Sequence, residues 1–315
     1  MLIVRICSGL GNQMYQYAFL LALKRNFHEE CVRFDDSVYA FHDVHHGFEL
    51  ENYFELEEGR LEQAYYRKLF PFRYYAVVNT WLNRKYKTSG IVSGGINKLD
   101  AIFGKKFTHY KEKKVYQYHP ETFVMDRQGR DIYFEGYWQN INYYEGMEQE
   151  LKTVFDFRKK IVLSDEDKKL LDDMENSESV GIHIRRGDYV NNPSFDLCGK
   201  EYYEEAIGYL AEKKPGMKLF FFTDDAEYVK ANYQKYHPCI INHPDSSGMD
   251  MYLMSKCKHN IIANSSYSFW GAFLNNNENK LVVAPKYVYR KNGRAEVFSL
   301  PQSWYVIDNL KVKHE

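Results

Sequence analysis

The sequence has no long apolar run, and this absence limits how the protein can meet a membrane. Its 315 residues contain no uninterrupted apolar stretch near the roughly 18 residues that a membrane-spanning helix needs. The N-terminus also lacks the basic region, apolar segment and small-residue cleavage site of a secretory signal. We therefore expect a cytoplasmic protein that is at most peripheral at the inner face of the membrane.

The chain also has few cysteines and almost no net charge. The five cysteines are odd in number and scattered, and they form no Cys-x-x-Cys pair, which is typical of reduced thiols. A formal net charge of -1 excludes a surface built as a whole for nucleic acid. Aromatic residues are plentiful at 17% of the chain, and their rings can stack on sugars.

The length of the chain favours two domains, which we place at residues 1–158 and 159–315, with the crossing at 157–160. The N-terminal domain begins with a predicted strand at 2–7, a glycine turn and a helix with apolar residues at helical spacing. A second predicted strand follows at 31–34. This order is that of a Rossmann-like unit, and a further strand is predicted within 131–139.

The glycine turn at Gly9 and Gly11 lacks the third glycine of the dinucleotide fingerprint. Two interpretations stay open. The turn could serve only to join a strand to a helix, or Asn12 and Gln13 could point their amides from the helix start toward a ligand.

Residues 179–189 carry the clearest chemistry of the C-terminal half. An apolar run that ends in Arg185, Arg186 and Asp188 predicts a buried strand that leads into a charged loop. Ligands of open α/β sheets bind beyond the carboxyl ends of the strands, and a guanidinium matches phosphate oxygens. We predict a phosphate-bearing ligand here; the alternative is an internal ion pair between one arginine and Asp188.

A second strand exit points to the same ligand class. The predicted strand 257–263 leads through Ser265 and Ser266 into a predicted helix at 269–274. Free N–H groups and the helix dipole both favour an anion at such a helix start. Two anion-binding exits in one half of the chain predict a diphosphate.

The paired acids of this half have structural explanations. Asp165-Glu166-Asp167 follows Ser164 and suits the capped start of a helix, so we assign no metal to it. Asp224 and Asp225 follow a predicted strand at 217–222, and we expect them to cap the next helix or hold a loop. Two further helices are predicted at 202–214 and 249–254.

Residues 60–114 differ from the rest in charge. They hold thirteen basic and three acidic residues, a net charge of +10, which leaves -11 for the remainder. Aromatic residues are interleaved. Such an element could lie against anionic lipid, grip nucleic acid or be a solvated helical face. A solvated face is the simplest structural interpretation, and anionic lipid is the functional interpretation that we favour.

Several stretches together resemble the galactoside α-1,2-fucosyltransferase family. The matching segments run in the family's order from residue 9 to about residue 285, while residues 37–125 carry little of the pattern. The lack of a membrane anchor is similar to the bacterial members. The stretches are Gly9-Leu-Gly-Asn-Gln-Met-Tyr-Gln-Tyr-Ala18, Gly136-Tyr-Trp-Gln139, His183-Ile-Arg-Arg-Gly-Asp-Tyr189, Asp250-Met251 and Cys257-Lys-His-Asn-Ile-Ile-Ala-Asn-Ser-Ser-Tyr-Ser-Phe-Trp270.

The resemblance implies an α/β, GT-B-like fold in which two Rossmann-like domains face a cleft and the C-terminal one holds GDP-fucose. It implies inverting transfer of L-fucose from GDP-β-L-fucose to the 2-hydroxyl of a terminal galactoside, with no cofactor and no metal. The acceptor would be a galactoside-containing glycan, as in O-antigen or other glycan biosynthesis. This glycan could be linked to a lipid.

The resemblance also implies which side chains act. Arg185 would bind the β-phosphate and the charge that grows on the leaving group, and Arg186 would support it as the second catalytic residue. The implied donor-binding residues are His183 and Asp250 for guanine, and Arg185, Ser265 and Ser266 for phosphate oxygens. Asn12 and Gln13 would face the acceptor.

Other interpretations stay open. Asp35, Asp36 and Asp188 could each approach the acceptor hydroxyl, and their spacing selects none as the catalytic base. A GDP-sugar or glycan-binding protein without transferase activity would use the same donor contacts, and so would a fucosyltransferase of different acceptor or linkage. An adhesion tripeptide at 186–188 needs an exposed loop, and the buried strand before it argues against this.

Overall fold

The chain folds into two compact units, Met1–Val154 and Phe155–Glu315. The computed structural model describes residues 1–28, 31–41, 46–126 and 129–311. The observed boundary lies slightly before the predicted one at 158/159. The rings of Phe155 and Phe157 pack on Trp270 and Tyr252, with centroids 5.1 and 6.2 Å apart, so both belong to the second unit.

The first unit is built on a parallel sheet of four strands in the order β2-β1-β4-β3. The predicted strands at 2–7 and 31–34 are present. The strand predicted within 131–139 ends at Glu135, and β3 is a strand that the sequence did not predict. The strands are β1 Leu2–Arg5, β2 Val32–Asp35, β3 Thr108–Lys111 and β4 Ile132–Glu135.

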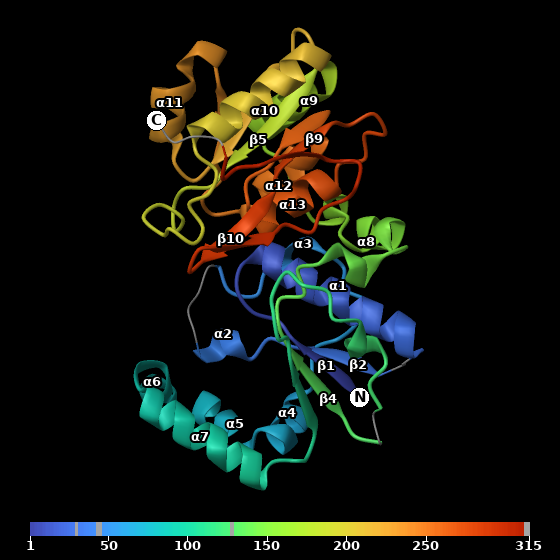
Figure 1. The fold of residues 1–315 in the computed structure, drawn as a ribbon. Coiled ribbons are helices and arrows are strands. Elements are labelled where there is room, and N and C mark those ends of the chain that lie inside the picture. Colours follow the sequence, from blue (N-terminus) through green and yellow to red (C-terminus); the bar gives the residue numbers. More distant parts are fainter. Residues whose placement is uncertain (29–30, 42–45, 127–128, 312–315) are drawn as a thin grey trace. The chain divides into compact units, whose positions relative to one another are not determined.

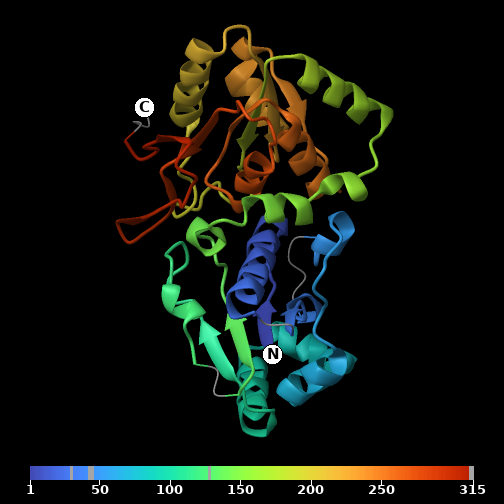
Figure 2. The same ribbon diagram turned by 90° about the vertical axis from the view of Figure 1, so that its right-hand side faces the viewer.

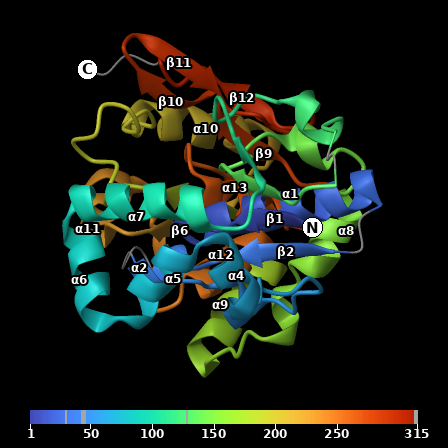
Figure 3. The same cartoon turned by 90° about the horizontal axis from the view of Figure 1, so that it is seen from below.

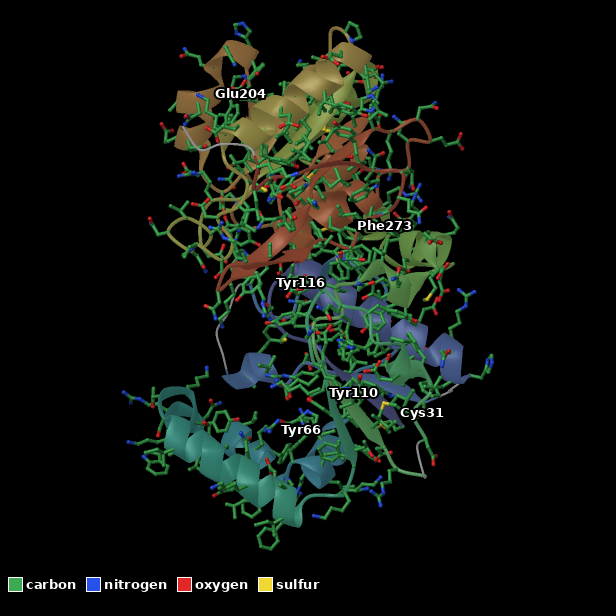
Figure 4. The ribbon with its side chains drawn as sticks, viewed as in Figure 1. Cys31, Tyr66, Tyr110, Tyr116, Glu204 and Phe273 are labelled. Carbon is green, nitrogen blue, oxygen red and sulfur yellow. The ribbon has the colours of Figure 1, made fainter. Side chains whose placement is uncertain are left out.

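Helices cover both faces of this sheet because neighbouring residues of a strand point to opposite sides. Helix α1 (Leu10–Phe27) packs Phe19 against Phe134 on one face, with ring centroids 5.5 Å apart. Helix α4 (Gln63–Leu69) packs on the other face, where Tyr66 joins a cluster with Ile3 and Tyr133 (Figures 1 and 4).

Three further helices form a small cluster beside α4 (Figure 3). They are α5 Pro71–Val78, α6 Thr80–Thr88 and α7 Gly90–Phe103. Ala76 and Ile96 are buried at their centre. Asn79 and Ser89 cap α6 and α7 by accepting backbone N–H groups, and Asp100 accepts from the backbone N–H of Phe72 in the first turn of α5.

The second unit contains a parallel sheet of six strands in the order β12-β9-β8-β5-β6-β7. The three strands predicted in this half are all present. Strand β5 lies in the interior of the sheet, between β8 and β6. The strands are β5 Ser179–Ile184, β6 Lys218–Thr223, β7 Cys239–Ile241, β8 His259–Ile261, β9 Val282–Pro285 and β12 Tyr305–Ile307.

Helices again cover both faces (Figure 2). Helices α10 (Lys200–Lys213) and α11 (Ala226–Tyr233) share a hydrophobic cluster with the side of the sheet that carries Ile182 and Phe221. Helices α9 (Asp165–Asn176) and α12 (Ser247–Lys256) pack on the other side. There Gly181 leaves room for α12, since an added Cβ would lie 3.3 Å from the Met254 Cγ.

Helix α13 (Ser266–Phe273) follows β8 and starts earlier than the predicted residue 269, because Ser265 caps it. The remaining elements are short. They are α2 Val38–Phe41, α3 Leu50–Tyr53, α8 Glu148–Val154, the hairpin of β10 Tyr287–Lys291 and β11 Arg294–Val297, and 3-10 turns at Pro120–Phe123, Ile141–Tyr144, Phe157–Lys159 and Gln234–Tyr236.

Two predictions from the sequence concern the state of the cysteines and membrane-spanning helices. All five cysteines lie within the described ranges, and each is a free thiol. Across the residues that the structure describes, no helix combines the length and the apolar character needed to cross a bilayer.

Candidate functional site

Three neighbouring strands of the second unit bring polar residues to one edge of the sheet. Arg185 follows β5, Asp224 follows β6, and a short segment after β8 ends at Ser265. Because β8, β5 and β6 are adjacent and parallel, their carboxyl ends share this edge. This is the position at which open α/β sheets bind ligands.

Arg185 is held between two carboxylates. Its Nη2 and Nε donate to Asp188 Oδ1 at 2.6 and 3.0 Å, and its Nη1 lies 2.8 Å from Asp224 Oδ2. Burial alone would lower the pKa of Arg185, but Asp224 and Asp188 raise it above its ordinary value. The internal pair with Asp188, one of the two interpretations of the sequence, is therefore present, and a second acid joins it.

Arg186 is fixed by three different contacts. Its Nε donates to Asp225 Oδ2 at 3.0 Å, its guanidinium lies 3.7 Å above the centroid of the Tyr228 ring, and its backbone N–H donates to Asp224 Oδ1 at 2.8 Å. Asp225 also caps α11 by accepting from the backbone N–H of Tyr228. The predicted roles of Asp224 and Asp225, in capping a helix and holding a loop, are confirmed.

Gly187 allows this arrangement. A Cβ added to it would lie 2.7 Å from Asp224 Oδ2, which is closer than real Cβ atoms approach an oxygen. Only glycine lets the backbone come this near to the carboxylate that binds Arg185. The loop therefore depends on this residue for a contact, and its backbone has no positive φ.

His183 is the last inward-facing polar side chain of β5. Burial, with the charge of Arg185 adding to it, lowers the pKa of His183 to about 3, so the ring is neutral at physiological pH. Its Nδ1 is buried and has no hydrogen-bond partner among the described residues. A buried polar atom without a partner costs about 1–3 kcal/mol, so a native protein leaves few of them, and a bound water, ion or ligand can satisfy this one.

The exit of β8 is joined to the exit of β5. Tyr267 of α13 has its ring centroid 5.2 Å from that of His183, and the hydroxyl of Tyr189 donates to the Asn264 carbonyl at 3.4 Å. Ser265 is buried, and its hydroxyl accepts from the backbone N–H of Tyr267 as the cap of α13. Ser266 is the first residue of that helix. The structure thus brings five of the six predicted site residues to one edge of the sheet.

Asp250, the sixth, reaches this region through α12. The hydroxyl of Tyr267 donates to the Ser247 carbonyl at 2.5 Å, which ties the start of α13 to the start of α12. Asp250 lies in the first turn of α12, where its carboxylate is bound by His243. Sequence reasoning did not single out His243, since no motif or spacing marks it.

The glycine turn of the first unit has a structural role. The buried Gln13 donates to the carbonyls of Ser8 and Gly47 at 2.9 and 2.8 Å and accepts from the backbone N–H of Glu49. The expectation that its amide faces an acceptor is therefore wrong. Asn12 accepts from the amide of Gln139, so it too has a partner within the unit.

The carboxylates considered as a catalytic base all have partners. Asp35 accepts from the Tyr133 hydroxyl at 2.5 Å, Asp36 binds Arg60 at 2.9 Å, and Asp188 binds Arg185. None is selected by this geometry.

The acidic triplet at 165–167 caps a helix, as predicted. Asp167 and Ser164 form a reciprocal capping box at the start of α9, and Asp165 pairs with Lys168 at 2.9 Å. In the part of the chain that the structure describes, no three His, Cys, Asp or Glu side chains group as metal ligands would.

Comparison with known proteins identifies the class. Residues 101–306 match the model of glycosyl transferase family 11. The O-antigen biosynthesis glycosyltransferase WbnK of Escherichia coli is 30% identical, over 93% of this chain and 96% of that protein. An alpha-1,2-colitosyltransferase of Escherichia coli is 29% identical, over 97% and 98%. The match to the family model and the similarity to WbnK show a glycosyltransferase: this chain belongs to glycosyl transferase family 11.

A shorter sequence match agrees with this family, and a solved structure shows the fold. The galactoside 2-alpha-L-fucosyltransferase SEC1 of Bos taurus is 26% identical over 106 residues, or 31% of this chain and 29% of that protein. The structure of POFUT1 in complex with GDP has a TM-score of 0.50 at 12% identity, covering 89% of this chain and 95% of that one. The predicted α/β fold of GT-B type is confirmed.

Proposed function

We propose that the protein transfers L-fucose from GDP-β-L-fucose to the 2-hydroxyl of a galactoside with inversion. The observation that carries the proposal is the edge of the second sheet, where Arg185, an unpartnered nitrogen of His183 and the start of α13 meet. The names of the related proteins support α-1,2 transfer, and one of them supports a colitosyl donor as the second candidate.

The reaction would form a bond between C1 of fucose and the acceptor oxygen and break the bond between C1 and the phosphate. The acceptor loses its hydroxyl proton to a base, and GDP leaves with the bonding electrons. Arg185, held rigid by Asp188 and Asp224, would meet the charge that develops on the diphosphate. The backbone N–H groups at Ser266 and the start of α13 would meet the remaining oxygens.

The same residues support a mechanism without a metal. A departing diphosphate needs positive charge or aligned N–H groups, and the arginine and the helix start supply both. Arg186 would act indirectly, by anchoring the loop through Asp225 and Tyr228. The neutral ring of His183 and the carboxylate of Asp250 would bind guanine, because a carboxylate can accept from guanine N1–H and from its 2-amino group.

Product analysis tests the proposal. Purified protein is incubated with GDP-fucose or a colitosyl donor and a panel of galactosides, and the linkage of each product is determined. An α-1,2-fucosylated galactoside is expected. Binding of GDP-fucose without any product would favour a binding protein, whereas a different linkage or a colitosylated product would replace the proposed donor or bond.

We also propose that the enzyme docks on anionic membrane, as a protein that modifies a lipid-linked acceptor would need. The docking face is the α5–α7 surface, defined here as the exposed side chains of these three helices. Ile91 and Trp81 are 90% and 66% exposed, which is unusual for large apolar residues. The surface also exposes Tyr75, Val78, Leu99, Ile102 and Phe103.

The same stretch of the chain is rich in basic residues. Residues 63–106 hold nine basic residues and one acid, Asp100, for a net charge of +8. Asp100 is buried, and the amine of Lys85 lies 6.0 Å from the Trp81 ring. Apolar side chains inside a basic surface suit an anionic bilayer, to which each nearby basic residue contributes about 1 kcal/mol.

Sedimentation with liposomes tests this surface. We compare a double variant, Trp81→Ser with Ile91→Ser, with a control that replaces Val162 and Val297, two exposed valines of the second unit, by serine. Binding to phosphatidylglycerol vesicles at low salt should be lost only in the first variant. Absence of wild-type binding, or equal loss in both variants, would reject docking, and concentration-dependent dimerisation through this surface would replace it with self-association.

A further inference from the structure

The guanidinium of Arg185 offers its N–H groups in two parallel pairs, and a carboxylate contacts each pair. Nε and Nη2 form one pair, and both donate to Asp188 Oδ1, at 3.0 and 2.6 Å. Nη1 and Nη2 form the other pair, and Nη1 lies 2.8 Å from Asp224 Oδ2. Phosphate binds a guanidinium best through two parallel N–H groups. A phosphate group on Arg185 must therefore displace one of these carboxylates or share a pair with it.

The carboxylate of Asp224 is fixed independently of Arg185. Its Oδ1 accepts from the backbone N–H of Arg186 at 2.8 Å. The backbone of Gly187 lies so close that an added Cβ would be 2.7 Å from Asp224 Oδ2. Movement of Asp224 would break a backbone hydrogen bond at the exit of β5, so this acid is a permanent partner of the arginine.

The carboxylate of Asp188 has no such anchor. Its side chain is 59% exposed, and within the described part of the chain both of its hydrogen bonds go to Arg185. The turn around it is held by backbone bonds, since the N–H groups of Tyr189 and Val190 each donate to the Arg186 carbonyl at 2.8 Å. Rotation of one side chain is therefore enough to release Asp188 into water, and an exposed ion pair of this kind contributes little stability.

Charge favours the release of Asp188 when an anion binds. A phosphate oxygen on Arg185 next to the Asp188 carboxylate would bring two negative charges close together, and such charges repel most strongly where burial lowers the dielectric constant. Release removes this repulsion. It also leaves no unpaired charge in the interior, because water can hydrate the exposed carboxylate.

We propose that Asp188 is an exchangeable counterion of Arg185: it occupies the Nε–Nη2 pair in place of a phosphate group, and a diphosphate displaces it on binding while Asp224 stays. The inference rests on the proposed function, in which Arg185 binds the diphosphate of the donor. Before the exchange Asp188 and Asp224 orient the guanidinium, and after it Asp224 and the diphosphate do. As a competitor within the loop, Asp188 weakens the binding of any diphosphate, including the GDP that the reaction releases.

Calorimetric binding of GDP and of pyrophosphate to the full chain tests the exchange. Pyrophosphate carries the diphosphate without the base or the sugar. Asp188→Asn should bind both ligands about threefold to tenfold more tightly than wild type, because a competing ion pair and a neighbouring negative charge are removed. The control is Asp196→Asn, which removes the same charge from an exposed residue in the same connection between β5 and α10. Its affinities should change by less than about twofold, since salt screens exposed charges that are not in contact.

A role in holding Arg185 would give the opposite result. If the ligand needed Asp188 to keep the guanidinium in place, Asp188→Asn would bind both ligands more weakly. That result, unchanged affinity, or an equal gain in Asp196→Asn would overturn the inference. Asp188→Ser repeats the test with a side chain too short to replace the carboxylate oxygen. The melting temperature of each variant should lie within about 4 °C of wild type, which shows that it is folded.

The outcomes separate this inference from the proposed function. Binding of GDP by wild type without a gain in Asp188→Asn would overturn the exchange and leave the proposed function standing. A gain for pyrophosphate in a protein that binds no GDP would support the exchange and overturn the proposed function. Absence of binding of both ligands to wild type and variants would overturn both statements.

Discussion

Replacing Arg185 with lysine should cost catalysis far more than it costs stability. The guanidinium spans two partners, with Nε and Nη2 on Asp188 and Nη1 on Asp224. A lysine ammonium is a point charge that can reach one of these carboxylates but cannot bridge them in the same plane. The variant keeps the charge and loses the direction in which the remaining N–H groups point.

The expected loss of stability and the expected loss of catalytic rate differ in size. Arg185 is partly buried at 31% exposure, so loss of one ion pair should cost about 1 kcal/mol of unfolding free energy, or about 2–4 °C in melting temperature. Loss of a preorganised donor to the charge that develops in the transition state costs about 10²–10³ in rate. Turnover should therefore fall by about that factor with a folded protein.

The assay measures kcat, KM for the donor and melting temperature on the same preparation. Arg186→Lys is the matched control, since Arg186 contacts Asp225 and Tyr228 and is proposed to act only through the loop. Near-native turnover in Arg185→Lys would remove Arg185 from the reaction, and unfolding of the variant would make its role structural.

Three further predictions follow from the same site. Transfer should continue in excess EDTA, because Arg185 and the start of α13 supply the positive potential; activity that returns only with added magnesium or manganese would contradict this. Gly187→Ala should lower kcat by up to about a hundredfold while the protein stays folded, since the new Cβ would displace Asp224, and unchanged kinetics would refute the contact. Melting temperature should depend on pH through two histidines of opposite sign. The pKa of His183 is lowered to about 3, so stability falls as pH drops from 6.5 toward 3, by about 1.4 kcal/mol per pH unit. The hydrogen bond to Asp250 raises the pKa of His243, so its contribution is complete below 6.5 and is lost as pH rises through that raised pKa. His243→Asn should abolish only the alkaline loss.

Local sequence was enough to predict the strand exits of the second unit. The apolar run of β5 followed by two arginines, and the serines ahead of α13, combine a change of polarity with a helix-start signal. Such signals arise within a few residues, and the elements they mark were found with small errors at their ends.

The partners of these residues could not be predicted in the same way. Asp224 meets Arg185 because β6 lies beside β5, and His243 meets Asp167 because α12 and the loop before it pack on α9. Both contacts depend on strand order and helix packing, which no short window of sequence encodes. Asp224 and Asp225 were therefore assigned to helix capping and loop support, and the contact between Asp224 and Arg185 was not predicted.

In the first unit, the sequence suggested a ligand contact where the structure has internal hydrogen bonds. Gln13 stands at the start of a helix after a glycine turn, which suggests a ligand, yet its amide is fully used by the backbone at Ser8, Gly47 and Glu49. Strand β3 was missed because exposed His109 and Lys111 alternate with only half-buried residues along an edge strand, where the apolar signal is weak. A motif can thus be distinctive because it holds a fold together.

The arginine loop has a consequence for competition among anions in the cell. Arg185 and Arg186 contact three aspartates, Asp188, Asp224 and Asp225, so these five side chains together carry a net charge of -1. Inorganic phosphate would have to share guanidinium groups that already have carboxylates, and would gain little attraction in return. A ligand that also brings a base and a sugar would gain contacts elsewhere, so the arginine loop discriminates against inorganic phosphate and still accepts a larger ligand that carries phosphate.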